Sequence, residues 1–559
     1  MDSVTTAAAA TVGTLAVSAY LNAKLHFRHD MRNLFGSRSP QYAIDYITER
    51  VKKDRILQYH ILEEQLQIPG RADSLFLIFP TDGRKWTYKQ FYDDVNRAGN
   101  WLLQEYEIKK GEVVALDGPN NPEYLILWFA LDSIGACPSY INCNLTKNTL
   151  THCLPKGVVM TSGREIVNGF SISKLLNLKP ADVFYTCLPL YHAAAHALCI
   201  TPVLNAGATV ILGRKFSHST FWPEVSLNGA THIQYVGELC RYLIHSRPHP
   251  LEREHKVRMA WGNGIRPDVW EPFRQRFNIP VIHELYAATD GMGPMFNFNR
   301  GDFSKHAIGI RGLLWHMVQG PNEKIVRIDI DTEEILRDPR TGRVIICKAG
   351  EPGEAIHKID PVNPKAAFAG YFDNEGASNK RFIKDVFKKG DLWFRSGDMM
   401  RYDPSGLVYF VDRLGDTFRW KSENVATNEV ADLLGTFPGI NECAVYGVLV
   451  PHADGRAGCA AIVLGEDKTE GTFDFKGLGK FAVAQLPRYA VPIFIRLTPQ
   501  ISYTGTMKMQ KGTLRKEGCD VELVEKTGDK LYWIPPGSDE YVPFKKTDYE
   551  QIQAEKSRL

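Results

Sequence analysis

The strongest constraint on this fold is a strand–helix–strand pattern that recurs along the first half of the chain. Residues 113–117 have the pattern of a buried strand, 121–134 that of an apolar helix, and 137–141 that of the next strand. Strands joined by a helical crossover at this spacing run parallel, and parallel sheets are covered by helices. The same pattern returns as strands at 183–187 and 208–212 around a helix at 193–205, and again as strands at 232–236 and 257–261 around a helix that ends at 245. It predicts an α/β domain built on a parallel sheet.

The pattern changes toward the C-terminus. Short strands with Gly/Pro turns occur near 325–330 and 342–348, and a new α+β pattern begins after about Gly415. A chain of 559 residues also exceeds the roughly 250–300 residues at which single cores stop growing. We therefore predict an α/β protein: a large N-terminal domain of parallel-sheet subdomains with a small β subdomain, followed by a small mobile α+β C-terminal domain.

Charge and cysteine content exclude several classes of protein. The chain has 67 Lys and Arg against 64 Asp and Glu, a net charge of +3, so nothing suggests nucleic acid as a partner. Its 10 cysteines contain no CxxC pair and form no His/Cys cluster at zinc spacing. A disulfide scaffold and a structural zinc site are therefore disfavoured, and a reducing compartment fits best.

The N-terminal segment, 1–55, points to a membrane. Residues 3–23 carry no charge, and Lys24, Arg28 and Arg32 follow them. The order fits a cleaved signal peptide poorly, because the positive charge comes after the apolar run. One interpretation is a membrane anchor or an interfacial helix with basic flanks facing the cytoplasm. The other is an Ala-rich surface helix or a disordered start.

The C-terminal tail, 546–559, ends in a targeting signal. Its last residues, Ser557, Arg558 and Leu559, are a conservative variant of the Ser-Lys-Leu tripeptide that a peroxisomal import receptor reads. The tail predicts a peroxisomal protein. The endoplasmic reticulum, lipid droplets and the plasma membrane are the alternative locations.

Six motifs follow one another along the chain and together suggest a family. They are LPLYH at 188–192, WGNGIRPD at 261–268, YAATD at 286–290, RSGD at 395–398, VDRLGDTFRWKSENV at 411–425 and YTGTMK at 503–508. In this order they resemble the adenylate-forming enzymes, which include acyl-CoA synthetases, luciferases and peptide-synthetase adenylation domains. The long motif, with IQYVGE at 233–238, is similar to the very-long-chain acyl-CoA synthetase and fatty acid transport protein branch. The resemblance extends from about residue 86 to about residue 520.

The resemblance implies a two-step ligase reaction. A fatty carboxylate attacks the α-phosphate of ATP, and the thiol of CoA then attacks the acyl carbon of the adenylate. It implies ATP, Mg²⁺ and CoA as co-substrates and a long- or very-long-chain fatty acid as the acyl substrate, with a coupling to fatty acid uptake. It also divides the chain into an AMP-binding domain at 56–414 and a mobile C-terminal domain at 415–545.

The same resemblance assigns the residues that would hold the nucleotide. Asp398 would accept hydrogen bonds from the ribose hydroxyls, because two carboxylate oxygens match a cis-diol. Arg413 would contact the ribose and phosphate region. Tyr286 would stack on adenine, and Asn263 and Gly264 would line its pocket, where glycine permits close backbone approach. Their structural alternatives are an exposed ion pair and ordinary strand-end turns.

Further residues would serve the chemistry. Lys508 would bridge the substrate carboxylate and the α-phosphate, and Thr289 would contact that phosphate. Asp290 would hold Mg²⁺, although the family has Glu there and the shorter arm favours a water-mediated contact. His192 would lie beside the acyl carboxylate, and Gly415 would be the domain hinge. A solvated lysine, a packed core histidine and an ordinary turn glycine are the alternatives.

The phosphate-binding loop departs from the family pattern. Only its tail, LPKG at 154–157, is present, so Lys156 remains as a phosphate contact. Relatives carry several tens of further residues before it, which include a helix, a strand and a Ser/Thr/Gly-rich run. The chain is thus shortened near 153–154, and we expect a core strand to be missing or replaced. An incorrect gene model and a true isoform with weak or no adenylation are the two explanations.

Three functions therefore stay open. The first is an ATP-dependent fatty acid–CoA ligase, which the retained site residues favour. The second is a catalytically impaired membrane protein that binds or transports fatty acids, which the shortened loop favours. The third is a ligase of the same chemistry that serves a specialised metabolite pathway.

Overall fold

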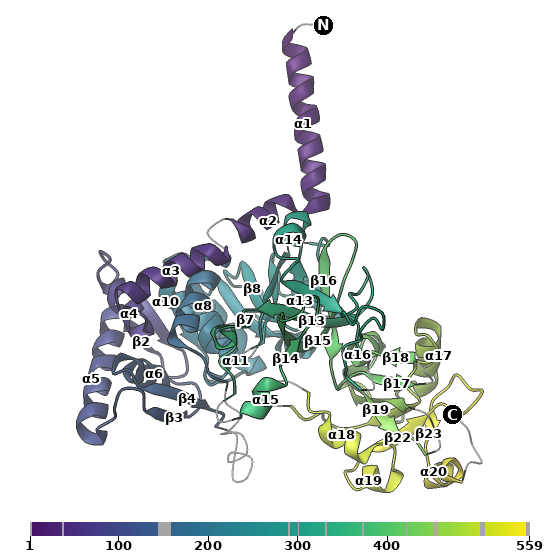
Figure 1. The fold of residues 1–559 in the computed structure, drawn as a ribbon. Helices are drawn as coiled ribbons and strands as arrows, with labels where there is room; N and C mark the ends of the chain where they lie inside the picture. Colours follow the sequence, from purple (N-terminus) through teal and green to yellow (C-terminus); the bar gives the residue numbers. More distant parts are fainter. Residues whose placement is uncertain are drawn as a thin grey trace.

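The computed structural model describes residues 3–35, 39–143, 158–288, 291–299, 301–329, 332–371, 374–420, 423–451, 453, 455–503 and 509–554. A large domain is followed by a smaller C-terminal domain (Figure 1). Four predicted site residues, Lys156, Thr289, Asp290 and Lys508, lie outside the described residues, as do the 153–154 junction and the terminal tripeptide.

An eight-stranded sheet forms the centre of the large domain, in the order β10-β9-β8-β7-β5-β6-β1-β2. The inner strands pair in parallel, and only the edge strands β2 and β10 run antiparallel to their neighbours. This confirms the parallel sheet that the sequence predicted. The strands are β1 (Leu75–Phe79), β2 (Arg84–Thr87), β5 (Val183–Thr186), β6 (Thr209–Leu212), β7 (His232–Val236), β8 (Met259–Asn263), β9 (Ile282–Tyr286) and β10 (Met295–Asn299).

Helices connect these strands and bury their faces. The helix predicted at 193–205 is present, with a π-helical turn, η2 (His196–Ile200), in its middle. Three tryptophans, Trp222, Trp261 and Trp270, are among the largest fully buried side chains of this core. The connecting helices are α8 (Ser162–Leu175), α9 (Ala193–Ala195), α10 (Thr201–Ala206), α11 (His218–Leu227), α12 (Gly237–His245) and α13 (Pro267–Arg276).

A second parallel pair lies apart from the large sheet. Strands β3 (Val113–Asp117) and β4 (Cys137–Ile141) pair in register and, among the described residues, make a sheet of their own. The helix between them is α6 (Pro122–Ser133), which packs on α5 (Tyr88–Tyr106). A two-stranded sheet at this point agrees with the expected loss of a core strand, because the residues after β4 lead to the shortened stretch.

The predicted β subdomain is an antiparallel sheet in the order β11-β16-β15-β13-β12, with β14 paired to β15. One short helix, α14, precedes β12. The elements are β11 (Gly309–Ile310), α14 (Leu313–Val318), β12 (Glu323–Val326), β13 (Gly353–Ile359), η3 (Pro364–Ala366), α15 (Glu375–Asn379), β14 (Phe382–Lys384), β15 (Leu392–Tyr402) and β16 (Leu407–Arg413).

The C-terminal domain has a sheet and a core of its own. Its strands follow the order β19-β20-β21-β22-β23, which confirms the α+β pattern expected after Gly415. The hairpin β17 (Phe418–Trp420) and β18 (Glu423–Val425) leads into it. The other elements are α16 (Thr427–Leu434), β19 (Ile440–Leu449), β20 (Arg456–Leu464), α17 (Phe475–Gln485), β21 (Phe494–Leu497), α18 (Gly512–Glu517), α19 (Val521–Glu525), β22 (Lys530–Trp533), β23 (Val542–Pro543) and α20 (Lys546–Gln553).

Four helices precede the large sheet. Helix α1 (Ser3–Leu25) projects away from the body, and α2 (Phe27–Leu34) lies at its base (Figure 1). Helices α3 (Pro40–Lys52) and α4 (Gln58–Leu66) lie against the large domain. Within the described part of the chain, every helix falls short of the length or the apolar character that crossing a bilayer requires.

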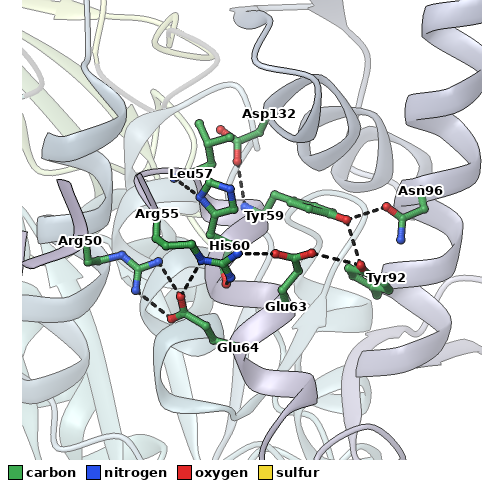
Figure 2. Close-up of polar contacts among 10 residues, drawn as sticks. All are labelled: Arg50, Arg55, Leu57, Tyr59, His60, Glu63, Glu64, Tyr92, Asn96 and Asp132. Atoms are coloured by element: carbon green, nitrogen blue, oxygen red, sulfur yellow. Dashed lines mark hydrogen bonds and ion pairs between the residues drawn. The ribbon is translucent and has the colours of Figure 1, made fainter. Parts of the chain in front are cut away.

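Hydrogen bonds and ion pairs link α3 and the following loop to α4, and they link α4 to α5 of the large domain (Figure 2). Arg50 donates to Glu64 at 2.8 Å, and Arg55 donates to Glu63, also at 2.8 Å. From α4, the Tyr59 hydroxyl donates to Asn96 of α5 at 2.8 Å. The N-terminal helices are thus held by charged and neutral hydrogen bonds as well as by packing.

The carboxylate of Asp132 completes this attachment from α6. One of its oxygens accepts a hydrogen bond from the Tyr59 backbone N–H at 2.8 Å, in the first turn of α4 (Figure 2). Burial raises the pKa of Asp132 to about 7, and the nearby Glu165 raises it further, against the effect of the backbone N–H donors. A helix N-terminus favours an anion, so the raised pKa means that burial outweighs this attraction.

Stability should therefore decrease with rising pH through Asp132. The folded protein keeps this proton to higher pH than the unfolded chain, so the free energy of unfolding falls between about pH 4 and pH 7. Asp132→Asn removes the titration and retains an acceptor oxygen. We expect urea unfolding to show this variant more stable than the parent at pH 8, by up to about 4 kcal/mol, with little difference at pH 4. An equal difference at both pH values would contradict this role.

Candidate active site

Three of the predicted nucleotide residues lie at one edge of the large sheet. Asn263 ends β8, Gly264 follows it, and Tyr286 ends the neighbouring strand β9. These two strands are parallel, with Gly262 opposite Glu284, so their carboxyl ends lie side by side. In open α/β sheets this edge is where ligands bind. The strand predicted at 257–261 lies two residues later than expected, as β8, which makes Asn263 a strand residue.

A buried glutamate that our sequence analysis missed lies directly beneath this edge. Glu284 of β9 accepts hydrogen bonds from the Gly264 backbone N–H and from the Tyr235 hydroxyl, each at 2.5 Å. Its side chain belongs to a residue only 2% exposed, and burial raises its pKa to about 8 although these donors oppose the shift. The Glu284 carboxyl can accept these hydrogen bonds in either protonation state, so it fixes the loop after β8. The sequence did contain a signal for this residue, namely a glutamate within a stretch that has the pattern of a buried strand.

Two glycines allow the loop to take this path. Gly264 has a φ of 77°, in the left-handed region that favours glycine. Gly237, at the start of α12, lies so close that a Cβ added there would be 1.7 Å from the Gly264 carbonyl oxygen. The loop and the first turn of α12 therefore fit together only when residue 237 is glycine.

Asp398 joins the β subdomain to the same edge. The Tyr286 hydroxyl donates to its Oδ2 at 2.6 Å, and Arg413 Nε lies 3.8 Å from its Oδ1. Asp398 and Arg413 are directly opposite each other on β15 and β16. Burial and the nearby Asp398 carboxylate raise the pKa of Tyr286, which keeps its hydroxyl a donor. The structure therefore brings together Tyr286, Asp398 and Arg413, as the sequence predicted for a nucleoside site.

The predicted hinge lies directly after β16. Gly415 occupies a turn with a φ of 83°. Just before it, the buried Asp412 accepts hydrogen bonds from the Thr427 backbone N–H at 2.7 Å, the Thr427 hydroxyl at 2.8 Å and the Asn428 amide at 3.0 Å. Both partners belong to α16 of the C-terminal domain. A rotation at Gly415 would therefore have to break these three bonds.

The two domains also meet beside the Gly264 loop. Arg266 donates to the Cys443 carbonyl at 3.4 Å and lies 3.5 Å from Asp432 of α16. It also donates to the Met509 sulfur at 3.7 Å and lies 3.7 Å from Glu238 of α12. On the other side, the rings of Tyr242 and Tyr503 lie 6.1 Å apart. The described residues that border the 504–508 stretch thus contact the large domain close to the Gly264 loop.

His192 lies at the same sheet edge, after β5. Its ring nitrogen accepts a hydrogen bond from the Ala194 backbone N–H at 3.2 Å, so it caps the short helix α9. One turn later, the buried His196 lies 3.2 Å from Glu165 of α8. Capping is a structural role, and His192 follows β5, whose carboxyl end lies on the same edge of the sheet as those of β7, β8 and β9.

Comparisons with known proteins agree with this arrangement. The "AMP-binding enzyme" family model matches residues 63–154 and 151–354, and the "AMP-binding enzyme C-terminal domain" model matches 429–508. A "Very long-chain fatty acid transport protein" from Cochliobolus heterostrophus is 47% identical, over 99% of this chain and 96% of its own. "Medium/long-chain-fatty-acid--CoA ligase FadD6" from Mycobacterium tuberculosis is 39% identical, over 70% of this chain and 62% of its own.

A solved structure shares the fold. The anthranilate CoA ligase AuaEII, in complex with anthranoyl-AMP, superimposes with a TM-score of 0.68 at 16% identity, over 83% of this chain and 97% of its own. At this identity the likeness concerns the fold alone.

The comparisons also locate the shortened segment. The match to the "AMP-binding enzyme" model breaks into two parts that meet at residues 151–154. The alignment with the C. heterostrophus protein spans 626 positions, more than the 559 residues of this chain, so that relative contains residues that this chain lacks. Both findings agree with a chain that is shortened relative to its relatives, and the loss of the phosphate loop near 153–154 stays a prediction.

The role of Glu284 can be tested on the Gly264 loop itself. Glu284→Ala removes the acceptor of two buried donors, which costs about 1–3 kcal/mol for each. We expect the backbone amide of Gly264, which donates to this carboxyl, to exchange with solvent about 10- to 100-fold faster. Hydrogen-exchange mass spectrometry of peptides that cover 262–268 measures this.

Glu284→Gln is the matched control, because it keeps an acceptor oxygen at the same place. We expect its amide exchange to resemble that of the parent. Equal protection in all three proteins would mean that Glu284 does not hold the loop.

Proposed function

Because this chain belongs to the AMP-binding enzyme family, we propose that it activates long- or very-long-chain fatty acids to acyl-CoA thioesters through an acyl-adenylate. The observation that carries this function is the meeting of Tyr286, Asp398 and Arg413 beside the Gly264 loop, at the ligand-binding edge of the sheet. The relatives named above, a fatty acid transport protein and a fatty-acid–CoA ligase, support the choice of acyl substrate.

The described residues account for adenosine binding. The Asp398 carboxylate accepts one hydrogen bond from the Tyr286 hydroxyl. Its remaining lone pairs can accept hydrogen bonds from the two hydroxyls of a ribose. Arg413, with a side chain 54% exposed, extends toward the phosphate side. Adenine lies against Tyr286 and the loop of Asn263 and Gly264, whose position Glu284 maintains.

The first step joins two anions, so it needs cations and fixed donors. A carboxylate oxygen of the fatty acid bonds to the α-phosphorus, the bond to the bridging oxygen breaks, and pyrophosphate leaves. Lys508 places its ammonium between the carboxylate and the α-phosphate, and Thr289 donates to that phosphate. His192 lies beside the carboxylate. Asp290 would hold Mg²⁺, which neutralises charge on the phosphates when bound.

The second step requires a different arrangement of the domains. The CoA sulfur bonds to the acyl carbon, the bond from that carbon to the phosphate oxygen breaks, and AMP leaves. In this proposal, a rotation at Gly415 turns a different face of the C-terminal domain toward the site. The hydrogen bonds between Asp412 and α16 oppose that rotation.

One finding favours a second candidate function. The missing segment is the part of the family that cradles the β- and γ-phosphates, and Lys156 is the one residue we assign to them. A chain without this cradle still binds adenosine and fatty acid at the remaining residues. It would then be an impaired enzyme that binds or transports fatty acids. A ligase for a specialised carboxylic acid would use the same site residues.

Two segments support a proposed location at peroxisomes and on a membrane. Helix α1 contacts a membrane, into which fatty acids partition. Conversion of these fatty acids to CoA thioesters traps them and so couples activation to uptake. The Ser557-Arg558-Leu559 terminus addresses the protein to the peroxisomal import receptor.

Pyrophosphate release tests the function directly. The purified chain, incubated with a long-chain fatty acid, ATP and Mg²⁺, should release pyrophosphate, which a coupled assay measures. A second chain with a Ser/Thr/Gly-rich loop and its preceding strand inserted before Leu154 should release it faster, because backbone N–H groups would again hold the triphosphate. Release from neither chain would contradict the ligase function, and release from the second chain alone would favour the impaired form.

Lys508 is tested in whichever of these two chains is active. Lys508→Ala should lower the rate of acyl-adenylate formation about 100-fold or more, because it removes a positioned cation from the transition state. Lys516→Ala, at an exposed lysine of α18, is the control and should keep the parent rate. Equal rates in the two variants would remove Lys508 from the mechanism.

A further inference from the structure

Exposed apolar side chains gather around the base of α1. They belong to α2, to α14 and to the loop before β11, and we name them the collar: Phe27, Met31, Phe303, Leu313, Met317 and Val318. Met317 is 67% exposed and Phe303 is 58% exposed. Single exposed apolar residues are ordinary on a protein surface, but a group of them from segments far apart in sequence marks a contact surface.

A buried aspartate joins the two helices of the collar. Asp30 of α2 is fully buried and accepts hydrogen bonds from the backbone N–H groups of Gly312 at 3.0 Å and Trp315 at 2.9 Å. These are the first donors of α14, so α2 caps α14 from a distance in sequence. His26 adds a hydrogen bond to the Ser405 carbonyl at 2.7 Å. These hydrogen bonds fix the two helices of the collar to each other and to the β subdomain.

Helix α1 leaves the body at the collar (Figure 1). Its described side chains include several exposed apolar residues and no charge before Lys24. The apolar surface of α1 is thus continuous with the collar at its base. The exposed apolar residues of α1 are Val12, Leu15, Val17, Tyr20 and Leu21.

Charge around the collar selects the kind of partner. Lys24, Arg28 and Arg32 are exposed on α1 and α2, next to the apolar side chains. An apolar surface bordered by basic residues suits an anionic lipid surface, which takes up both. A second copy of the chain fits less well, because it would bring the same basic residues together.

We propose that the collar is a second membrane contact, which lies on an anionic lipid surface beside the contact made by α1. The side chains of α2 and α14 enter the boundary between headgroups and acyl chains, and the basic residues contact the phosphates. Because Asp30 fixes both helices to the β subdomain, this contact sets the orientation of the whole body on the membrane. The proposal rests on the membrane contact proposed above for α1.

Vesicle flotation of the full chain tests the collar. We expect binding to vesicles of phosphatidylcholine with phosphatidylserine, and weaker binding to phosphatidylcholine alone. The double variant Leu313→Glu/Met317→Glu should lower the partition coefficient about tenfold or more, because it removes apolar burial and adds negative charge. Arg28→Gln/Arg32→Gln should lower it about fivefold per side chain at low salt.

Two matched variants separate the possible results. Val362→Glu changes an apolar residue that is 89% exposed but lies outside the collar, and it should bind as the parent does. Leu15→Glu/Leu21→Glu weakens α1 alone and should leave residual binding that the collar variant then removes. Thermal unfolding of each variant checks that the fold is kept.

Three results would overturn the proposal. If the collar variant and Val362→Glu bind equally while the α1 variant loses binding, α1 alone contacts the membrane and the collar does not. If the parent binds no vesicles, neither contact exists, whereas pyrophosphate release still reports separately on the ligase function. If the parent forms a dimer that the collar variant loses, the collar is an interface between copies of the chain.

Discussion

Parallel pairing of β5, β7, β8 and β9 is the constraint on which the rest of this structure depends. Because these strands run the same way, their carboxyl ends meet at one edge, and the chain must place a loop there after each strand. Glu284 shows what this arrangement requires. The loop after β8 has a backbone N–H that faces the buried interior, and the Glu284 carboxyl of β9 accepts hydrogen bonds both from it and from the Tyr235 hydroxyl. The sheet therefore supplies both the position of the site and the support beneath it.

The same edge is where the three parts of the molecule meet. The β subdomain contributes Asp398, which Tyr286 contacts, and the C-terminal domain meets the large domain at Arg266. A ligand at this edge would touch residues from more than one part of the molecule. Its binding would therefore be coupled to any movement of the domains. Asp412 carries the cost of that movement, because its buried carboxylate would lose the donors of α16 when the domains rotate.

The shortened segment separates binding from chemistry. The residues that we propose for adenosine come from β8, β9, β15 and β16, and they lie in the described structure. We assign the missing residues to the phosphate side, and β3 and β4 form a two-stranded sheet among the described residues. A fold can tolerate this loss because α6 still packs on both strands and on α5, and Leu116 of β3 still belongs to the large core. Catalysis tolerates it less well, because a triphosphate needs several donors at fixed positions.

Local patterns in the sequence determined the strands, the crossover helices, the α+β character of the C-terminal domain and the family motifs. They succeed because burial repeats every second residue in a strand and about every fourth in a helix, so a short window holds the information. Tertiary structure alone decided the pairing of Tyr235 with Glu284, 49 residues apart, and of Asp30 with Gly312, 282 residues apart. A buried polar group must find a partner, but its own sequence neighbourhood does not say which distant group will lie within 3 Å. The collar and the support beneath the site are therefore properties of the folded chain.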